Sequence, residues 1–474
     1  MPTIKEAFMP AQRPRFAPAR APATRRLRPL AVAVGLALGL GALSVQAQSL
    51  QELYDAARGY DATYLGAKAL ADSTQYKAAQ ADALGRPTVG LSAGATTAQA
   101  DPPSTLSTTT GQAIPGSSDR RGTTTLQVGV SATHPLYNTA NGATISQAQR
   151  SLEVSKADLE TAEQDLIVRV ALAYFDVLAS QDNLTTAQTS KKAISEQLAS
   201  AKRNFEVGTA TITDTREAQA RFDLATAQEL AADNDLRTKR LALDAIAGRS
   251  NVEPKPLAVP VVLPNTATGD VESWVGIAQT QHPTVRKAQL ALAIAKLETE
   301  KAKATDGPTV DLNGNVGSSR VNGSGTTAPG NTVSASVGVL FKLPLYSGGA
   351  LQNRIKETLQ LEEKSRDDLE AARRGVVQGT RASFYGVQSL VAQVKALEAA
   401  ESSSQLALEA TQLGYKVGVR VNLDVLNAQT QLFNARRDLA KARYDVLVNG
   451  LKLRQAAGQL KPDDVTGVNQ LLAK

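Results

Sequence analysis

Residues 414–428 read GYKVGVRVNLDVLNA and separate two long segments with helical periodicity. Gly418 interrupts the first segment, and Asn422 or Asp424 can cap the second by accepting hydrogen bonds from its free N–H groups. A related turn occurs 210 residues earlier, where FEVG at 205–208 precedes another helical pattern. The sequence therefore predicts the same helical turn twice in one chain.

The segments that lead into these turns are unusually long. Residues 143–207 contain no Gly or Pro, and as a single helix they would extend roughly 95 Å at about 1.5 Å per residue. Leu152, Leu159 and Leu166 recur every seven residues, as the seam of a coiled coil requires. A second long helix is expected at 351–413. This length predicts a coiled coil or a tube of helices.

Each long helix is preceded by two stretches that alternate between apolar and polar or small residues. In the first, Val89, Leu91 and Ala93 alternate with Thr, Gly and Ser, which is the period of a strand with two different faces. We expect one β-hairpin at 88–134 and a second at 309–343. Apolar-out and polar-in alternation is typical of a transmembrane barrel, and a pair of hairpins packed on a soluble core is the alternative.

The amino-terminal residues 1–47 have the pattern of a secretory signal peptide. Arg25, Arg26 and Arg28 precede an apolar run at 30–45, and small residues follow. This segment holds seven of the 52 basic side chains and one of the 45 acidic ones, which leaves 45 basic and 44 acidic side chains. A nearly neutral mature chain argues against nucleic acid as a partner. Because the chain has no cysteine, packing rather than disulfides is expected to hold it together.

We expect the chain to contain two copies of one structural unit. After the signal peptide at 1–47, a first repeat with a linker covers 48–265 and a second repeat covers 266–474. Each repeat is expected to contain a helix, a hairpin, a long helix, a turn and a further helix; the first helix is predicted as one segment from 48 to 84. The fold class is an α+β membrane protein with four strands per chain.

Four strands cannot close a membrane barrel by themselves. The smallest bacterial barrels have about 8 strands, and open strand edges are not tolerated in lipid. Two chains would supply 8 strands with little or no lumen, and three would supply 12. The sequence therefore predicts a symmetric oligomer.

Several short motifs recur in order along both halves of the chain. They are Pro87, Pro135, Pro308 and Pro344 at the expected strand–helix junctions, Ala173-Tyr174-Phe175, Val207-Gly208, Thr213-Asp214, Leu343-Pro344-Leu345-Tyr346 with Gly348-Gly349, Gly414-Tyr415-Lys416-Val417-Gly418 and Tyr444-Asp445-Val446-Leu447. In order and spacing they resemble the TolC type of outer-membrane channel, and the resemblance covers essentially all of the chain after residue 47.

The resemblance implies a homotrimer with a 12-stranded β-barrel continued by a long periplasmic α-helical coiled-coil barrel. It implies an exit duct of a tripartite export system, for multidrug efflux or type I protein secretion, that is gated at its periplasmic helical end. The implied partners are a periplasmic adaptor, an inner-membrane ABC or proton-driven pump, and outer-membrane lipid. The implied location is the outer membrane, with a large periplasmic part.

The resemblance also assigns roles to residues at the two turns. Tyr415 and Arg420 are implied to close the gate by bonding to Thr213 and Asp214, and an Arg–carboxylate bond at a wetted surface is strong enough to hold yet reversible. Asp424 matches the first of two acidic rings at the narrowest point of the family's channels.

At the second ring position this chain has the neutral Asn427, so its field for cations should be weaker. The Val-Gly pairs Val207, Gly208, Val417 and Gly418 resemble the positions where adaptor hairpins dock.

Enzyme functions find no support in the sequence. It contains no nucleophile elbow, phosphate loop or HExxH motif, and its two histidines, His134 and His282, belong to no cluster with metal-ligand spacing. We therefore expect a protein that is not an enzyme and needs no cofactor or metal. A trimeric adhesin of the autotransporter kind is the alternative function, although it would place its strands together at the carboxyl terminus. A periplasmic adaptor would lack the two hairpins.

Overall fold

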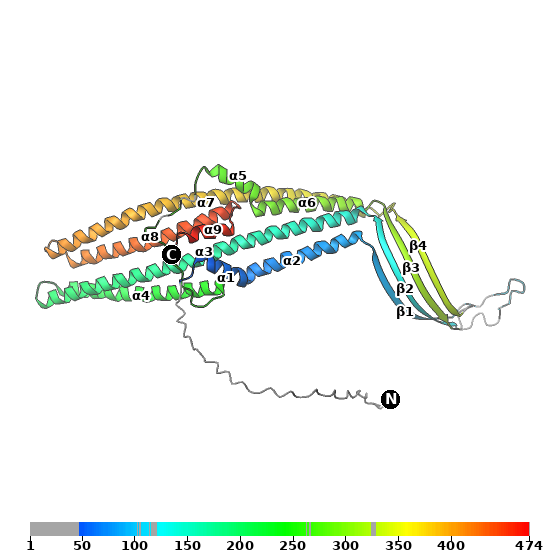
Figure 1. Ribbon diagram of the computed structural model, residues 1–474, viewed down its shortest axis with the longest axis horizontal. Helices are drawn as coiled ribbons and strands as arrows, with labels where there is room; N and C mark the ends of the chain where they lie inside the picture. Colours follow the sequence, from blue (N-terminus) through cyan, green and yellow to red (C-terminus); the bar gives the residue numbers. More distant parts are fainter. Residues whose placement is uncertain are drawn as a thin grey trace, which may run out of the picture. The chain divides into compact units, whose positions relative to one another are not determined.

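The computed structural model describes residues 47–473 except 102, 104, 105, 113, 115–120, 262, 265, 266 and 324–328. The predicted signal peptide lies outside the described residues apart from Ala47. In chain order the elements are α1 (Leu50–Tyr60), α2 (Ala62–Asp82), a 3₁₀ turn (Ala83–Gly85), β1 (Thr88–Ala100), β2 (Arg121–Tyr137), α3 (Thr139–Glu206), α4 (Ile212–Ala247), α5 (Val271–Gln281), α6 (Pro283–Ala304), β3 (Thr309–Asn322), β4 (Gly330–Lys342), α7 (Ala350–Lys416), α8 (Asn422–Ala456) and α9 (Pro462–Asn469). Figure 1 shows the long helices running alongside one another, with the strands continuing from one end of them.

The long helices predicted from the absence of Gly and Pro are present. α3 has 68 residues and α7 has 67, and each is followed by a shorter helix of 36 or 35 residues. The pairs α3 with α4 and α7 with α8 pack along their lengths. Within the part of the chain that the structure describes, no helix combines the length and apolarity needed to cross a membrane.

The expected single helix at 48–84 is instead two helices separated at Asp61. The Asp61 side chain accepts a hydrogen bond from the Tyr64 N–H at 2.8 Å and so caps α2. Both of its carboxylate oxygens also accept hydrogen bonds from the Arg169 guanidinium, at 2.8 and 2.9 Å. This contact with α3 is a long-range constraint that the local helical pattern does not reveal.

The four strands form one antiparallel sheet in the order β1-β2-β3-β4. The pairing of β2 with β3 joins the two hairpins, and it places Val130 opposite both Leu91 and Val316. Since side chains alternate between the faces, the apolar positions of all four strands lie on one face. That face is open to the surroundings: Val337, for example, is 82% exposed.

The opposite face of the sheet carries small and polar side chains. The Thr133 hydroxyl donates a hydrogen bond to Asn313 Oδ1 at 3.0 Å, and Ser336 bonds to Asn315. Ser131 lies opposite Asn315 on the neighbouring strand. The sheet therefore has one apolar face and one water-compatible face, as the alternation predicted.

Three of the four junction prolines lie outside the strands. Pro87 and Pro308 immediately precede β1 and β3, and Pro344 follows β4. Pro135 instead lies inside β2, which continues to Tyr137 rather than ending at residue 134. The ladder is irregular between Pro135 and Tyr137, as expected where proline supplies no N–H donor.

The largest core forms where α1, α3, α4, α8 and α9 meet. Tyr174 and Phe175 pack edge to face at 5.4 Å, and Phe175 stacks on Tyr444 of α8 at 5.7 Å. The Tyr174 hydroxyl donates to the carbonyl oxygens of Gln48 and Lys255, and burial raises the pKa of Tyr174. This core fixes α8 against α3, so that the turns ending α3 and α7 lie at the same end of the helices.

Candidate functional site at the helix turns

The two predicted turns have the same backbone geometry. Gly208 and Gly418 both have φ of +80°, which a residue with a side chain adopts only with strain. In each turn an N–H bonds back to a carbonyl of the last helical turn: Thr209 to Asn204 at 2.8 Å, and Val419 to Gly414 at 2.9 Å. The turns are thus structural equivalents.

The predicted adaptor-docking positions are exposed. Val207 is 72% exposed and Val417 is 66% exposed. Further large apolar side chains are exposed at or beside the same turns, namely Phe205, Ile212, Leu413, Val419 and Val421. Single exposed apolar residues are ordinary, whereas several gathered at one end of the helices are typical of an interaction surface.

The second turn holds Arg420 through local contacts. A Cβ atom at Gly414 would lie 2.8 Å from Arg420 Cγ, so the absence of a side chain at Gly414 leaves room for the arginine. Arg420 Nη1 lies 3.6 Å from Asp424 Oδ2. The predicted latch cation and the predicted ring carboxylate therefore face each other within one chain.

The two helices that leave the turns are capped differently. Thr211 caps α4: its hydroxyl accepts from the Asp214 N–H at 3.2 Å, and Asp214 Oδ2 accepts from the Thr211 N–H at 3.0 Å. In α8 the cap residue is Val421, which makes no side-chain hydrogen bond. The expectation that Asn422 or Asp424 caps α8 is wrong. Because valine has no hydroxyl to engage it, Asp424 is left to pair with Arg420.

Three side-chain hydrogen bonds join the first helix pair, α3 and α4, to the second pair near the turns. Asn204 Nδ2 donates to the Tyr415 hydroxyl at 3.1 Å. Arg221 Nη2 donates to Asn427 Oδ1 at 2.9 Å. Gln197 donates to the buried Asn422.

The four predicted latch residues do not bond to one another within the described chain. Thr213 is exposed on the first turn of α4, and Asp214 is engaged by Thr211. No hydrogen bond or ion pair between described residues joins Tyr415 or Arg420 to either of them. Tyr415 does bond to the first helix pair, but its partner is the side-chain amide of Asn204.

Sequence reasoning missed Asn204, Gln197 and Arg221. Gln197 and Asn204 are seven residues apart, so they lie on the same face of α3. Two amide side chains at that spacing, just before a turn, were the signal that could have pointed to Gln197 and Asn204.

A partly buried pair continues these contacts along the helices. The Tyr444 hydroxyl of α8 donates to Asp182 Oδ2 of α3 at 2.7 Å. Burial raises the pKa of the Asp182 carboxyl, although the hydrogen bond from Tyr444 opposes the shift. Polar bonds therefore link the two helix pairs from the turns to the central core.

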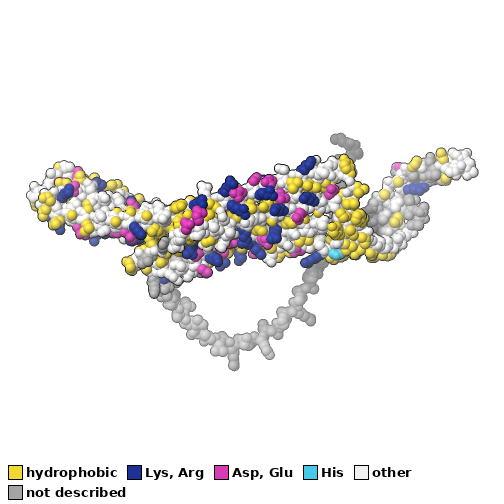
Figure 2. Space-filling view, turned by 90° about the horizontal axis from the view of Figure 1, so that it is seen from above, with side chains coloured by type: hydrophobic (Ala, Val, Ile, Leu, Met, Phe, Trp, Pro, Cys, Tyr) yellow, Lys and Arg dark blue, Asp and Glu magenta, His cyan; other side chains and the backbone are white. Residues whose placement is uncertain are grey.

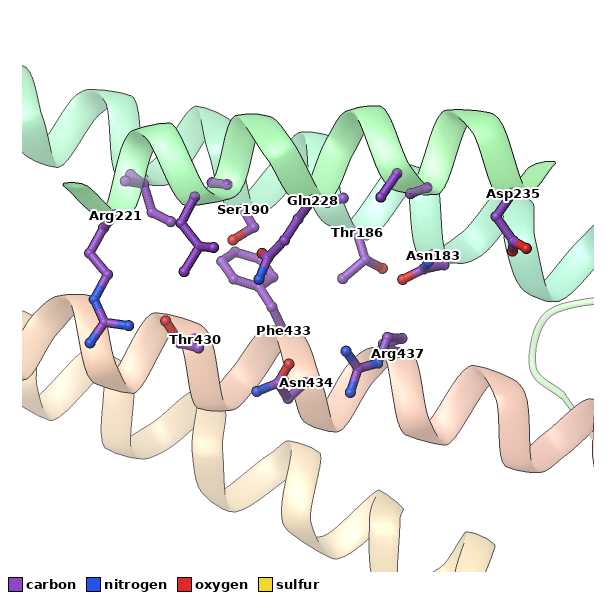
Figure 3. Close-up of a pocket in the computed structure, with 16 residues that line it drawn as sticks. Asn183, Thr186, Ser190, Arg221, Gln228, Asp235, Thr430, Phe433, Asn434 and Arg437 are labelled. Atoms are coloured by element: carbon purple, nitrogen blue, oxygen red, sulfur yellow. The ribbon is translucent and has the colours of Figure 1, made fainter. Parts of the chain in front are cut away.

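A cavity of about 430 Å³ lies between α3, α4 and α8. Figure 3 shows Arg221 extending from α4 towards α8, and Phe433 extending from α8 towards the other two helices. The cavity is lined by Thr and Ser hydroxyls, amides, small apolar residues, Asp235 and Arg437. It holds no concentration of acidic or nucleophilic groups.

The chemistry of the site is that of a surface rather than a reaction centre. Among the described residues, no group of three or more His, Cys, Asp or Glu side chains has the arrangement of a metal site. Figure 2 shows basic and acidic side chains interspersed on one face of the helices. The arrangement can dock partners and exchange weak polar bonds.

The chain is similar to known outer-membrane proteins. The family model described as "Outer membrane efflux protein" matches residues 53–249 and 274–459. The outer membrane protein TolC of Vibrio cholerae is 32% identical over 447 residues, which cover 94% of this chain and 98% of that protein. The alkaline protease secretion protein AprF of Pseudomonas aeruginosa is 32% identical over 314 residues, covering 66% of this chain and 65% of AprF.

Solved structures agree in fold. The outer-membrane channel OprN superposes with a TM-score of 0.74 at 18% identity, covering 86% of this chain and 90% of that one. VceC of Vibrio cholerae superposes with a TM-score of 0.71 at 20% identity, covering 86% and 96%. The family match covers most of the chain, and the sheet and the paired helices agree with the fold of these channels. The chain therefore belongs to the outer membrane efflux protein family.

Proposed function

We propose that this protein is a homotrimeric, gated exit duct of the outer membrane that serves a tripartite export system. The observation that carries the proposal is the four-stranded sheet, which has one exposed apolar face, one polar face and a neighbour on only one side of β1 and of β4. Three copies supply 12 strands, which close a barrel with its apolar face in lipid and its polar face around water. Closure also removes the open edges.

The helices supply the second part of the duct. With 68 residues, α3 extends roughly 100 Å at about 1.5 Å per residue. Six long helices and six shorter ones, from three chains, form a coiled-coil tube in the periplasm. The two repeats at 48–265 and 266–474 each contribute one hairpin and one helix pair, so the tube has pseudo-sixfold character.

The gate lies at the helix turns. Asp424 and Asn427 from three chains form the narrowest rings, and Tyr415 and Arg420 act as the latch. Thr213 and Asp214 are their proposed partners, although Tyr415 and Arg420 do not bond to either of them within the described part of one chain. The bond from Tyr415 to Asn204 supports a polar link between the helix pairs at this end, whereas Arg420 pairs with Asp424 of its own helix pair.

The exposed Val-Gly turns at 207–208 and 417–418 are the docking points of a periplasmic adaptor, which connects the duct to an inner-membrane ABC or proton-driven pump. Named relatives of the chain include both an efflux protein and protease secretion proteins, so the proposal covers both kinds of cargo. The alternative of a trimeric adhesin finds no support among them.

Cysteine cross-linking tests the barrel directly. Because the natural chain has no cysteine, pairs introduced along β1 and β4 report only on those two strands. In membranes, oxidation of pairs in register should give covalent trimers. Dimers, or no cross-link at any register, would refute the trimeric barrel.

Conductance in planar bilayers tests the gate. The double variant Tyr415→Phe with Arg420→Ser should conduct more than the natural trimer, because both polar contacts that hold the second turn are lost. Unchanged conductance would remove the latch assignment while leaving the barrel intact.

A further inference from the structure

The apolar face of the sheet carries one charged residue. Among the described strand residues whose side chains lie on that face, Arg320 of β3 is the only Lys, Arg, Asp or Glu. Register places Arg320 opposite Leu126 of β2 and Asn331 of β4. The other charged strand residues, Arg121, Asp311 and Lys342, have the opposite parity and lie on the polar face.

In the proposed barrel, Arg320 would lie at the height where the hydrocarbon of the membrane ends. It follows Thr309, the first residue of β3, by 11 residues. At about 3.3 Å per residue and a tilt of about 35–45°, that length rises roughly 26–30 Å, whereas the apolar band of such barrels is about 25 Å tall. The aliphatic positions Val310, Leu312 and Val316 of β3 precede it on the same face.

The Arg320 guanidinium has no partner among the described residues. Arg320 is exposed and makes no ion pair with any described residue. An unpaired cation facing lipid is costly unless it meets water or an anion at the headgroup level. Its planar set of N–H donors matches two oxygens of a phosphate.

Beside Arg320 the sheet is hollowed. A shallow hollow of about 580 Å³ is lined by Arg320, Ser318 and Asn331 of β3 and β4 and by small and aliphatic residues of β1 and β2, among them Ala93, Ala95, Leu126 and Val128. Polar donors on β3 and β4 beside an apolar floor on β1 and β2 match an amphiphile with an anionic head. A soluble phosphate would use only the polar donors.

We propose that Arg320 binds the phosphate of an outer-leaflet glycolipid whose acyl chain lies over Leu126 and Val128. The proposal rests on the proposed function, because it requires that this face meets lipid. Arg320 would anchor each subunit at the outer boundary of the membrane.

The test uses the full-length trimer in phosphatidylcholine vesicles that contain either phosphorylated lipid A or its dephosphorylated form. Lipid retained after detergent extraction is counted by native mass spectrometry. The natural protein should retain the phosphorylated form about fivefold more, the preference expected of one interfacial arginine. Arg320→Gln should abolish the preference and Arg320→Lys should keep part of it. Lys342→Gln, which removes a cation from the polar face, should leave it unchanged.

Two results would overturn the proposal. One is equal retention of both lipids by a natural trimer that inserts and conducts. The other is loss of the retained lipid when inorganic phosphate is added at millimolar concentration, which would indicate a site for the soluble anion. A protein that fails to insert or to form trimers would instead refute the proposed function.

Discussion

The Tyr415 hydroxyl accepts a hydrogen bond from the Asn204 side-chain amide at 3.1 Å, and this bond joins the last turn of α7 to the last turn of α3. The ring of Tyr415 packs beside Leu408, Val425 and Leu432 in the core between α7 and α8. The hydroxyl therefore reaches out of one helix pair to the other. If the gate opens by separating the pairs, this bond has to break.

Asn204→Ala should open the gate although it replaces none of the four predicted latch residues. Loss of one such hydrogen bond, worth about 0.5–1.5 kcal/mol, raises the open population about two- to tenfold. Single-channel recording measures the effect. Tyr415→Phe should have the same effect, and combining the two should add little because they remove the same bond. Tyr76→Phe, which alters an exposed tyrosine on α2, should change nothing, and fully additive effects would contradict the contact.

Replacement of Asn427 by Asp should strengthen block by multivalent cations. Three added carboxylates around the axis should lower the blocking concentration about three- to tenfold, and the effect is limited because the Arg221 guanidinium, 2.9 Å away, neutralises part of the new charge. Asp424→Ala should weaken the block. Planar-bilayer titration with divalent and trivalent cations measures both. Asp438→Asn, an exposed change farther along α8, is the control, and indifference to both ring changes would place the constriction elsewhere.

The two caps should respond in opposite directions when their residues are exchanged. Thr211→Val removes the hydroxyl that accepts from Asp214 and should cost about 1 kcal/mol in the first turn of α4. Val421→Thr should stabilise α8 and draw Asp424 away from Arg420. Hydrogen exchange of the first-turn amides should quicken in the first variant and slow in the second. The control Thr238→Val, an exposed change within α4, should leave the exchange rates at both turns unchanged. Unchanged exchange rates in the two cap variants would refute the capping difference.

The ion pair between Asp61 and Arg169 should make stability depend on acidity. The guanidinium of Arg169 lowers the pKa of the Asp61 carboxyl. Its stabilisation is therefore complete above the unfolded value of about 3.9 and is lost as the pH falls through the lower, folded value. Asp61→Asn keeps a capping side chain but removes the charge, so it should cost about 1–3 kcal/mol at pH 7. In thermal unfolding, the loss of stability caused by Asp61→Asn should become smaller below about pH 4. A loss that does not change with pH, or an equal loss in the exposed control Asp72→Asn, would contradict the assignment.

The sequence by itself determined the long helices, the strands and the two turns, although it missed the break at Asp61. Local physics explains this: the 65 residues at 143–207 contain neither Gly nor Pro, the two residues that most strongly interrupt a helix. Alternation at 88–95 separates two faces whatever the strand pairs with, and glycine alone suits the backbone at 208 and 418. Fold class and family followed from the order of these signals, because periodicity and turn chemistry depend on neighbours in the chain.

Only the tertiary structure decided which side chains meet. The Asp61 carboxylate at the helix break binds Arg169, 108 residues away, and within the chain Tyr415 bonds to Asn204 rather than to Thr213 or Asp214. Likewise, only the structure showed that β3 extends to Asn322, which places Arg320 within the strand and on its apolar face. A polar side chain bonds to the partner that packing brings within about 3 Å. That distance is set by long-range packing between helices and by strand register, and neither is encoded in the local pattern.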